Sequence, residues 1–323
     1  YAHAESGFLL PSGAVLTDLV IEALRPASPR LSPSIPEIMI HDTAVDHNSG
    51  RLIILVDDDL LVIDETVTSP IVHVESINAR AVRAIHSEDR IMAITESGIL
   101  LVYRLSDFDL IGEYNFSAQG TSTNPIGEWD DNFPAHASVV EDDSTWIAHG
   151  CHIFWRAVNT SFNNWSFHDF CNSNPSQAQF SSIHATHDTV YLGTDGDGLI
   201  VLERSNDGSM ADIVWSNTTY YSTGQGTTTI RSDSISSIEM MDEQILIAGE
   251  GGVDRHHLPS NSWLSPWTTS NWLNSNDVIN LLTIDNNTYV STPSMIHRFD
   301  IGTMTFVDDI SPDQANLDQF DIV

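Results

Sequence analysis

The stretch TVYLGTDGDGLIVLE, residues 189–203, reads as a strand, a turn rich in glycine and aspartate, and a second strand. Similar text returns roughly every 40 to 55 residues along the chain. The segments that match its first half are LIILVD at 52–57, IMAITE at 91–96, WIAHG at 146–150, LIAGE at 246–250 and YVST at 289–292. The chain is therefore predicted to be an array of one repeated unit.

Each unit contains four short apolar runs separated by tight polar turns. One run precedes the repeated strand, as in residues 180–185, and two follow it. Four short antiparallel strands at this period are typical of a β-propeller blade. We find no amphipathic helical stretch of useful length, which argues against an α/β fold. The expected fold class is all-β.

A small residue recurs within the repeated strand of five units. We place it at Ala93, Ala148, Gly193, Ala248 and Ser291. Inner strands of a propeller crowd around the axis, where a bulky side chain would collide with the next blade. The pattern therefore predicts close packing between neighbouring blades.

Six blades can be counted, at residues 36–75, 77–115, 135–171, 178–216, 230–272 and 276–309. Residues 1–30 lack a first strand, whereas residues 317–323 read as a first strand with nothing after it. We expect these two ends to pair and complete a seventh blade, because such closure removes exposed sheet edges. Residues 1–323 are thus predicted to form one propeller domain, cut from a longer protein because residue 1 opens in mid-blade.

The charge of the chain is strongly negative, since 12 basic residues face 45 acidic ones for a net charge of −33. Every basic residue is arginine. Such a surface repels phosphate groups and anionic lipid, so neither nucleic acid nor membrane insertion is expected. An acidic coat suited to high salt, cation binding and simple solubility all remain open.

Two cysteines, Cys151 and Cys171, fall in the third predicted blade. In our strand assignment Cys151 begins the third strand and Cys171 ends the fourth. An antiparallel pair puts these positions side by side, which favours a disulfide over two free thiols. Five glycosylation sequons begin at Asn115, Asn159, Asn164, Asn217 and Asn286. Together these features favour an extracellular or cell-surface location.

Residues 191–199, YLGTDGDGL, and residues 246–253, LIAGEGGV, resemble the repeat of propeller sensor domains in hybrid two-component regulators. Residues 234–238 and 276–282 are similar to the strand that precedes it in that family. The resemblance is good over residues 180–300. It implies a sensor or ectodomain propeller that binds a protein or glycan ligand, and it transfers no catalytic residues.

Turns between the second and third strands of a blade lie on the same propeller face as the connections between blades. This places a set of acidic residues on one rim, with the insertion at residues 117–134 beside it. We predict the following binding residues: Glu5, Asp57, Asp58, Glu96, Trp129, Asp130, Asp131, His149, Asp195, Asp197 and Glu250. Asp195 and Asp197 are also candidate ligands for Ca²⁺, although solvated turn residues are the simpler interpretation. No other cofactor is expected.

Histidine is abundant, with 14 residues. Candidates that could converge near the axis are His149, His152, His184, His187, His256 and His257. With carboxylates they would permit a rival function, a lyase or hydrolase acting on a polysaccharide or a small ester. No catalytic motif accompanies them. The favoured interpretation is therefore a non-catalytic binding module of a surface protein or sensor.

Overall fold

The computed structural model describes residues 40–46, 49–64, 71–116, 129, 133–140, 143–158, 160, 164–171, 179–204, 215–223, 230–284, 287–303 and 305–310. These residues form six four-stranded antiparallel sheets. The strands of the first three are β1 (Ile40–Asp46), β2 (Arg51–Val56), β3 (Asp59–Ile63), β4 (Ile71–Ser76); β5 (Ala79–Ile85), β6 (Arg90–Thr95), β7 (Ile99–Arg104), β8 (Leu110–Asn115); and β9 (Ala135–Val140), β10 (Ser144–His149), β11 (His152–Ala157), β12 (Ser166–Asp169).

The strands of the other three sheets are β13 (Phe180–Ala185), β14 (Thr189–Thr194), β15 (Leu199–Arg204), β16 (Trp215–Tyr221); β17 (Ile235–Met241), β18 (Gln244–Gly249), β19 (Gly252–His257), β20 (Ser262–Trp263); and β21 (Asn280–Ile284), β22 (Asn287–Thr292), β23 (Met295–Asp300), β24 (Thr305–Ile310). A short 3-10 helix, η1 (His86–Glu88), lies between β5 and β6. The prediction of an all-β fold built from four-stranded blades is confirmed.

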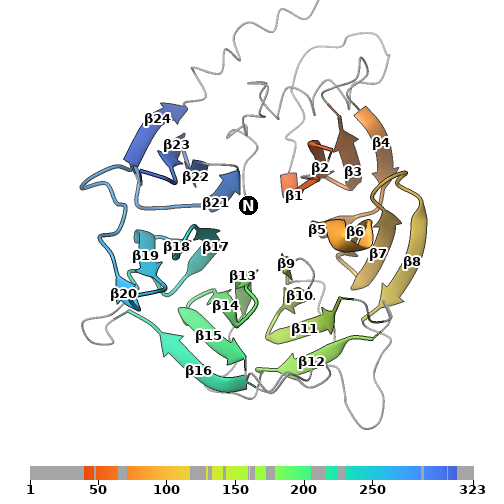
Figure 1. Cartoon of the computed structure of the whole chain (residues 1–323), viewed down its shortest axis with the longest axis horizontal. Coiled ribbons are helices and arrows are strands. Elements are labelled where there is room, and N and C mark those ends of the chain that lie inside the picture. The colour runs from red at the N-terminus through yellow and green to blue at the C-terminus, as the bar shows by residue number, and fades with distance from the viewer. Residues whose placement is uncertain are drawn as a thin grey trace, which may run out of the picture.

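The six sheets are arranged as blades around an axis, with the first strand of each blade innermost (Figure 1). Their inner strands pack in the order β1, β5, β9, β13, β17 and β21. The described residues thus form six blades rather than the seven predicted. The two chain ends predicted to complete a seventh blade, residues 1–30 and 317–323, lie outside the described residues.

Blade boundaries agree with the prediction to within a few residues at most ends. In the fourth blade the outer strand reaches Tyr221 rather than residue 216, because Thr219 and Tyr221 continue the pairing with β15. In the fifth blade β20 ends at Trp263 rather than near residue 272. Residues 264–272 instead return Trp267 to an isolated bridge with Val253.

Apolar residues from neighbouring blades form the core between them. A Cβ atom added to Gly193 would lie 2.6 Å from Ile235 Cγ2 of the next blade, so the predicted close approach is real there. The assignment of Ala93 to the same position was wrong by one residue. Ile94 pairs with Ala81 as Gly193 pairs with Ser182, so isoleucine fills that position in the second blade.

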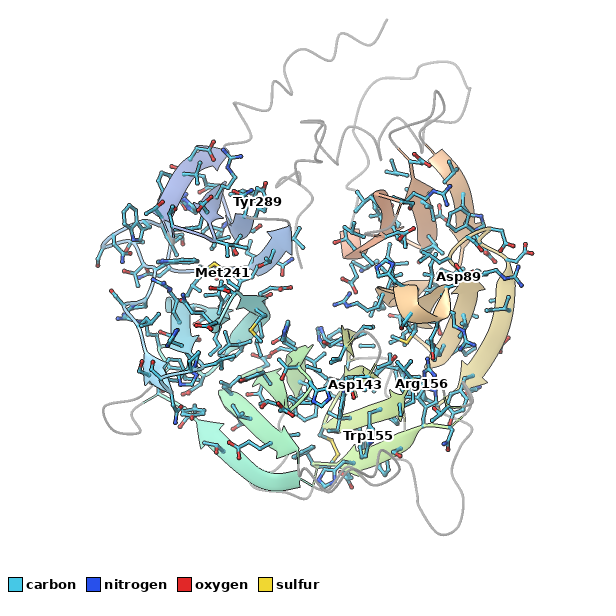
Figure 2. The ribbon with its side chains drawn as sticks, viewed as in Figure 1. Asp89, Asp143, Trp155, Arg156, Met241 and Tyr289 are labelled. Atoms are coloured by element: carbon cyan, nitrogen blue, oxygen red, sulfur yellow. A yellow bond between two sulfur atoms is a disulfide. The ribbon has the colours of Figure 1, made fainter. Side chains whose placement is uncertain are left out.

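Buried contacts between charged or polar side chains also join neighbouring blades. Arg156 Nη2 of β11 contacts Glu88 Oε2 of the second blade, and the arginine side chain is 0% exposed. Figure 2 shows Arg156 at the side of its blade that faces the blade carrying Asp89. Between the first two blades, His86 Nδ1 lies 3.1 Å from Asp46 Oδ1. The blades are thus held by polar as well as apolar contacts, with the Arg156–Glu88 ion pair between the second and third.

The predicted disulfide between Cys151 and Cys171 is present. Its Cα atoms are 5.1 Å apart, and the yellow bond lies in the outer part of the third blade (Figure 2). His152 of β11 is opposite Asp169 of β12, and Phe170 N donates to Cys151 O at 2.9 Å, so Cys171 directly follows the residue paired with Cys151. Among the described residues, no helix has the length and apolar character needed to cross a bilayer.

Candidate functional site: the turn face

Turns between second and third strands meet the connections between blades on one face of the propeller, which we call the turn face. Ile77 N donates to Asp58 O at 2.7 Å, and Glu96 N donates to Asn78 O at 3.1 Å. In the fourth blade, Gly196 N donates to Asp233 O at 3.0 Å. The prediction that these turns and connections share a face is confirmed.

Several predicted binding residues lie in the turns of this face. Those with exposed side chains are Asp57, Asp58, Asp195 and Glu250. Asp57 has a φ of 49°, in the left-handed region that a tight turn requires and that aspartate tolerates better than most residues. These four carboxylates come from three blades and give the face its negative charge.

Glu96 belongs to the same face but is engaged by a cation. Its Oε2 lies 3.1 Å from Arg80 Nη2 and accepts a hydrogen bond from Asn78 Nδ2 at 3.3 Å. Arg80 Nη1 in turn lies 3.2 Å from His41 Nε2 of the first blade. Arg80 therefore links Glu96 to the first blade, and its cation partly balances the Glu96 charge.

The Trp129 side chain lies between the second and third blades and contacts both. Its Nε1 donates to Glu96 O at 2.8 Å, and its ring stacks on His149 with centroids 3.6 Å apart and planes 3° apart. A Cβ atom on Gly98 would lie 2.5 Å from Trp129 Cδ2, so glycine makes room for the indole. Trp129 is half-buried and His149 is buried. The two predicted binding residues are brought together, and each covers the other.

Asp195 and Asp197 have contacts within the turn and to the next blade. Asp195 Oδ1 accepts a hydrogen bond from Ser234 Oγ at 2.8 Å, and Asp197 N donates to Thr194 Oγ1 at 3.0 Å. In the part of the chain that the structure describes, only one group brings three or more potential metal ligands together, and these two aspartates are not in it. Ca²⁺ binding here stays a prediction.

Three predicted binding residues, Glu5, Asp130 and Asp131, lie outside the described residues. The candidate histidines are scattered rather than gathered. His184 is on inner strand β13, His152 is on β11, and His187 lies in the turn before β14. The pair His256 and His257 is on β19, the third strand of its blade.

The inner strands carry a second set of ionisable residues, two of which sequence reasoning missed. Arg83, His184 and Glu239 occupy equivalent register positions on β5, β13 and β17. Each follows an aliphatic residue in the first strand of its blade, and aligning those strands would have revealed them. Arg83 Nη1 donates to Asp42 Oδ2 at 2.6 Å.

Burial shifts the pKa values of two residues in this inner set. It raises the pKa of Glu239 to about 7, against the opposing effect of the Arg83 charge. It lowers the pKa of His184 to about 4, and the same arginine acts in the same direction. The charge of Arg83 thus acts on residues two and three blades away. The direct contact of Arg83 is with Asp42, and it joins the inner strands of the first two blades.

Neither a protein-family profile nor a curated protein matches this sequence. The resemblance to two-component sensor propellers therefore stays a prediction. Among solved structures, the crystal structure of the RRP9 WD40 repeats superposes with a TM-score of 0.61 at 10% sequence identity. That alignment covers 87% of this chain and 86% of the other. At this identity the likeness shows the fold alone: the chain is a β-propeller with a WD40-like architecture.

Proposed function

We propose that the chain is a protein-interaction module whose turn face binds a positively charged segment of a partner. The observation that carries the proposal is the exposure of Asp57, Asp58, Asp195 and Glu250 in turns of three blades on one face. Propellers commonly use such loops on a rigid scaffold for recognition. Charges spread over several blades suit an extended basic segment better than a single small ion.

The composition supports the same choice of partner. A net charge of −33 without any lysine gives the molecule a negative field. Such a field accelerates encounters with a basic surface and opposes encounters with nucleic acid or anionic lipid. Binding should therefore weaken as salt is added.

We further propose that the module works outside the cytoplasm, as part of a longer surface or sensor protein closed by a seventh blade. The disulfide supports an oxidising compartment, because such bonds persist mainly in secreted and surface proteins. The repeat text around residues 191–199 supports the sensor type by resemblance.

A matched pair of variants tests the binding surface. The turn-face variant carries Asp57→Asn, Asp58→Asn, Asp195→Asn and Glu250→Gln. The control variant removes the same charge from turns that join other strand pairs, with Asp109→Asn, Asp188→Asn, Asp242→Asn and Glu243→Gln. Asp57 and Asp242 both have positive φ, which asparagine tolerates. Each variant therefore includes one substitution at a left-handed backbone position.

The probe is a displayed library of random peptides selected on the unmodified protein. We expect enrichment of lysine- and arginine-rich peptides, and at least a tenfold loss of their affinity in the turn-face variant. The control variant should bind within about twofold of the unmodified protein. Equal losses of affinity in both variants would show that the turn face is not the binding surface. Binding to a glycan array that requires Ca²⁺, with no peptide enrichment, would favour the glycan alternative.

A second candidate is the lyase or hydrolase function, which the inner set of Arg83, His184 and Glu239 favours. A carboxyl group with a pKa of about 7 is suited to proton transfer near neutral pH. We would screen acidic and neutral polysaccharides and nitrophenyl esters with the unmodified protein and with Glu239→Gln. Turnover that Glu239→Gln abolishes would replace the binding proposal, whereas turnover that this variant retains would exclude the inner site.

A further inference from the structure

The outer strands of the third blade bring four potential metal ligands together. Cys151, His152, Asp169 and Cys171 each offer one ligand atom, and these atoms all lie within 4.8 Å of one another. No other such group of three or more occurs among the described residues. The group lies at the end of the β11–β12 pair, where His152 is opposite Asp169.

The histidine is oriented toward the other ligands. His152 Nε2 is 3.3 Å from Cys171 Sγ and 3.7 Å from Asp169 Oδ1. Its ring packs on Phe167, with centroids 5.6 Å apart and planes 28° apart. Cys171 N donates to Asp169 Oδ1 at 2.7 Å, which fixes the carboxylate beside the sulfur. The contacts that orient the imidazole and the carboxylate, with the Phe167 ring and the Cys171 amide, do not involve the sulfur atoms.

Two thiolates, an imidazole and a carboxylate are a ligand set that suits Zn²⁺. A tetrahedral zinc ion with both Zn–S bonds at about 2.3 Å requires the sulfurs to be about 3.8 Å apart. A disulfide holds them much closer and leaves them without the negative charge that binds metal. The disulfide and the metal site thus exclude each other.

We infer that this cluster is a redox-controlled zinc site, closed by the Cys151–Cys171 disulfide and opened by its reduction. A dithiol reductant breaks the S–S bond, gives its two electrons and two protons to the sulfurs and becomes a disulfide itself. Zinc binding then displaces the two thiol protons to solvent. Oxidation by hydrogen peroxide re-forms the S–S bond, consumes two protons, yields two water molecules and releases the ion.

The test uses the whole chain, oxidised or reduced with dithiothreitol and then freed of reductant without air. Zinc is titrated against a chromophoric indicator, and cobalt is used to detect thiolate-to-metal charge-transfer absorption. We expect one Zn²⁺ per reduced chain, bound roughly a hundredfold more tightly than by the oxidised chain. The cobalt band should appear only after reduction, and peroxide should release the bound ion.

Variants separate this site from general attraction to an acidic surface. Cys151→Ser/Cys171→Ser should bind like the oxidised chain, and His152→Ala should weaken binding by about tenfold or more. The control is His168→Ala, since side chains alternate along β12 and His168 faces away from Asp169. It should bind like the unmodified protein.

Three results would overturn the inference. The first is reduced protein that binds zinc no more tightly than oxidised protein. The second is a double serine variant that matches the reduced protein, which would mean that surface carboxylates hold the ion. The third is a reduced chain that loses its circular-dichroism spectrum and still takes up no zinc.

Discussion

The junction between the second and third blades and the junction between the fourth and fifth are built in different ways. At the first, large side chains bridge the blades: Arg156 pairs with Glu88, and Trp129 lies between Glu96 and His149. At the second, the turn after β14 is bonded to the backbone of the connection to the next blade, since Gly196 N and Gly198 N both donate to Asp233 O. Ser181 Oγ donates to the backbone oxygen of Ile235. The side chains of Ser182 and Ile235 occupy the space that a Cβ atom at position 193 would need.

Only one of these two junctions is built from residues of the repeat. The junction of the fourth and fifth blades uses the glycine and aspartate text that defines the repeat, so any blade with that text can form it. The junction of the second and third uses residues that occur once. We therefore expect added bulk to weaken the junction of the fourth and fifth blades. Loss of a charge or of ring stacking should weaken the junction of the second and third.

The largest effect is expected from Arg156→Ala. This change leaves Glu88 at a buried junction without its main partner, and breaking a buried pair costs about 3–5 kcal/mol. Urea unfolding measures the loss. Arg298→Ala is the control, because its pair with Asp308 is half-exposed and such pairs contribute about 1 kcal/mol or less. Equal losses for the two variants would contradict the special role of the Arg156 junction.

Removal of the disulfide should have the next largest effect. It tests whether the stability of the third blade depends on the Cys151–Cys171 bond as well as on contacts with the second blade. Cys151→Ala/Cys171→Ala opens a loop between residues 20 positions apart, which should cost about 3 kcal/mol through the unfolded chain. Adding reductant to the unmodified protein in the absence of metal should lower its stability by a similar amount and leave the variant unchanged. A variant as stable as the oxidised protein would show that the bridge is dispensable.

Added bulk at the other junction should cost about 2 kcal/mol. In Gly193→Ala the new Cβ would lie 2.2 Å from Ser182 Oγ and 2.6 Å from Ile235 Cγ2, so both blades must shift. Gly112→Ala is the matched control in strand β8, where the nearest atom, Val102 Cβ, is 3.7 Å away. Thermal unfolding of Gly193→Ala and Gly112→Ala measures the loss of stability in each variant. Equal melting temperatures for the two variants would contradict the close approach of the two blades at Gly193.

The smallest effect concerns Glu239, on the inner strand beside the same junction. Its folded pKa of about 7 exceeds the ordinary value of 4.5, so the folded state holds the proton more tightly. This contribution to stability is complete below pH 4.5 and is lost as the pH rises through 7. Since Glu239 keeps partial exposure, we expect about 1 kcal/mol of loss relative to Glu239→Gln. Parallel pH profiles of the two proteins would contradict it.

Blade boundaries and the turn face could be predicted because the YLGTD text and its glycines mark strand ends directly. Contacts between unlike residues could not. Glu88 and Arg156 are 68 positions apart and belong to no repeat, so nothing in the sequence pairs them. The register of Ala93 was misjudged because alanine is common in buried strands and marks no single position. Trp129 was expected in a loop, but its neighbours Gly98 and His149 come from two different blades.

Hydrogen exchange measured with and without a saturating selected peptide shows whether the turn face is the binding surface. We expect slower exchange in the turns at residues 57–58, 195–198 and 250–252, with little change elsewhere. Protection confined to the turns at residues 186–189 and 241–244, which join first to second strands, would contradict it.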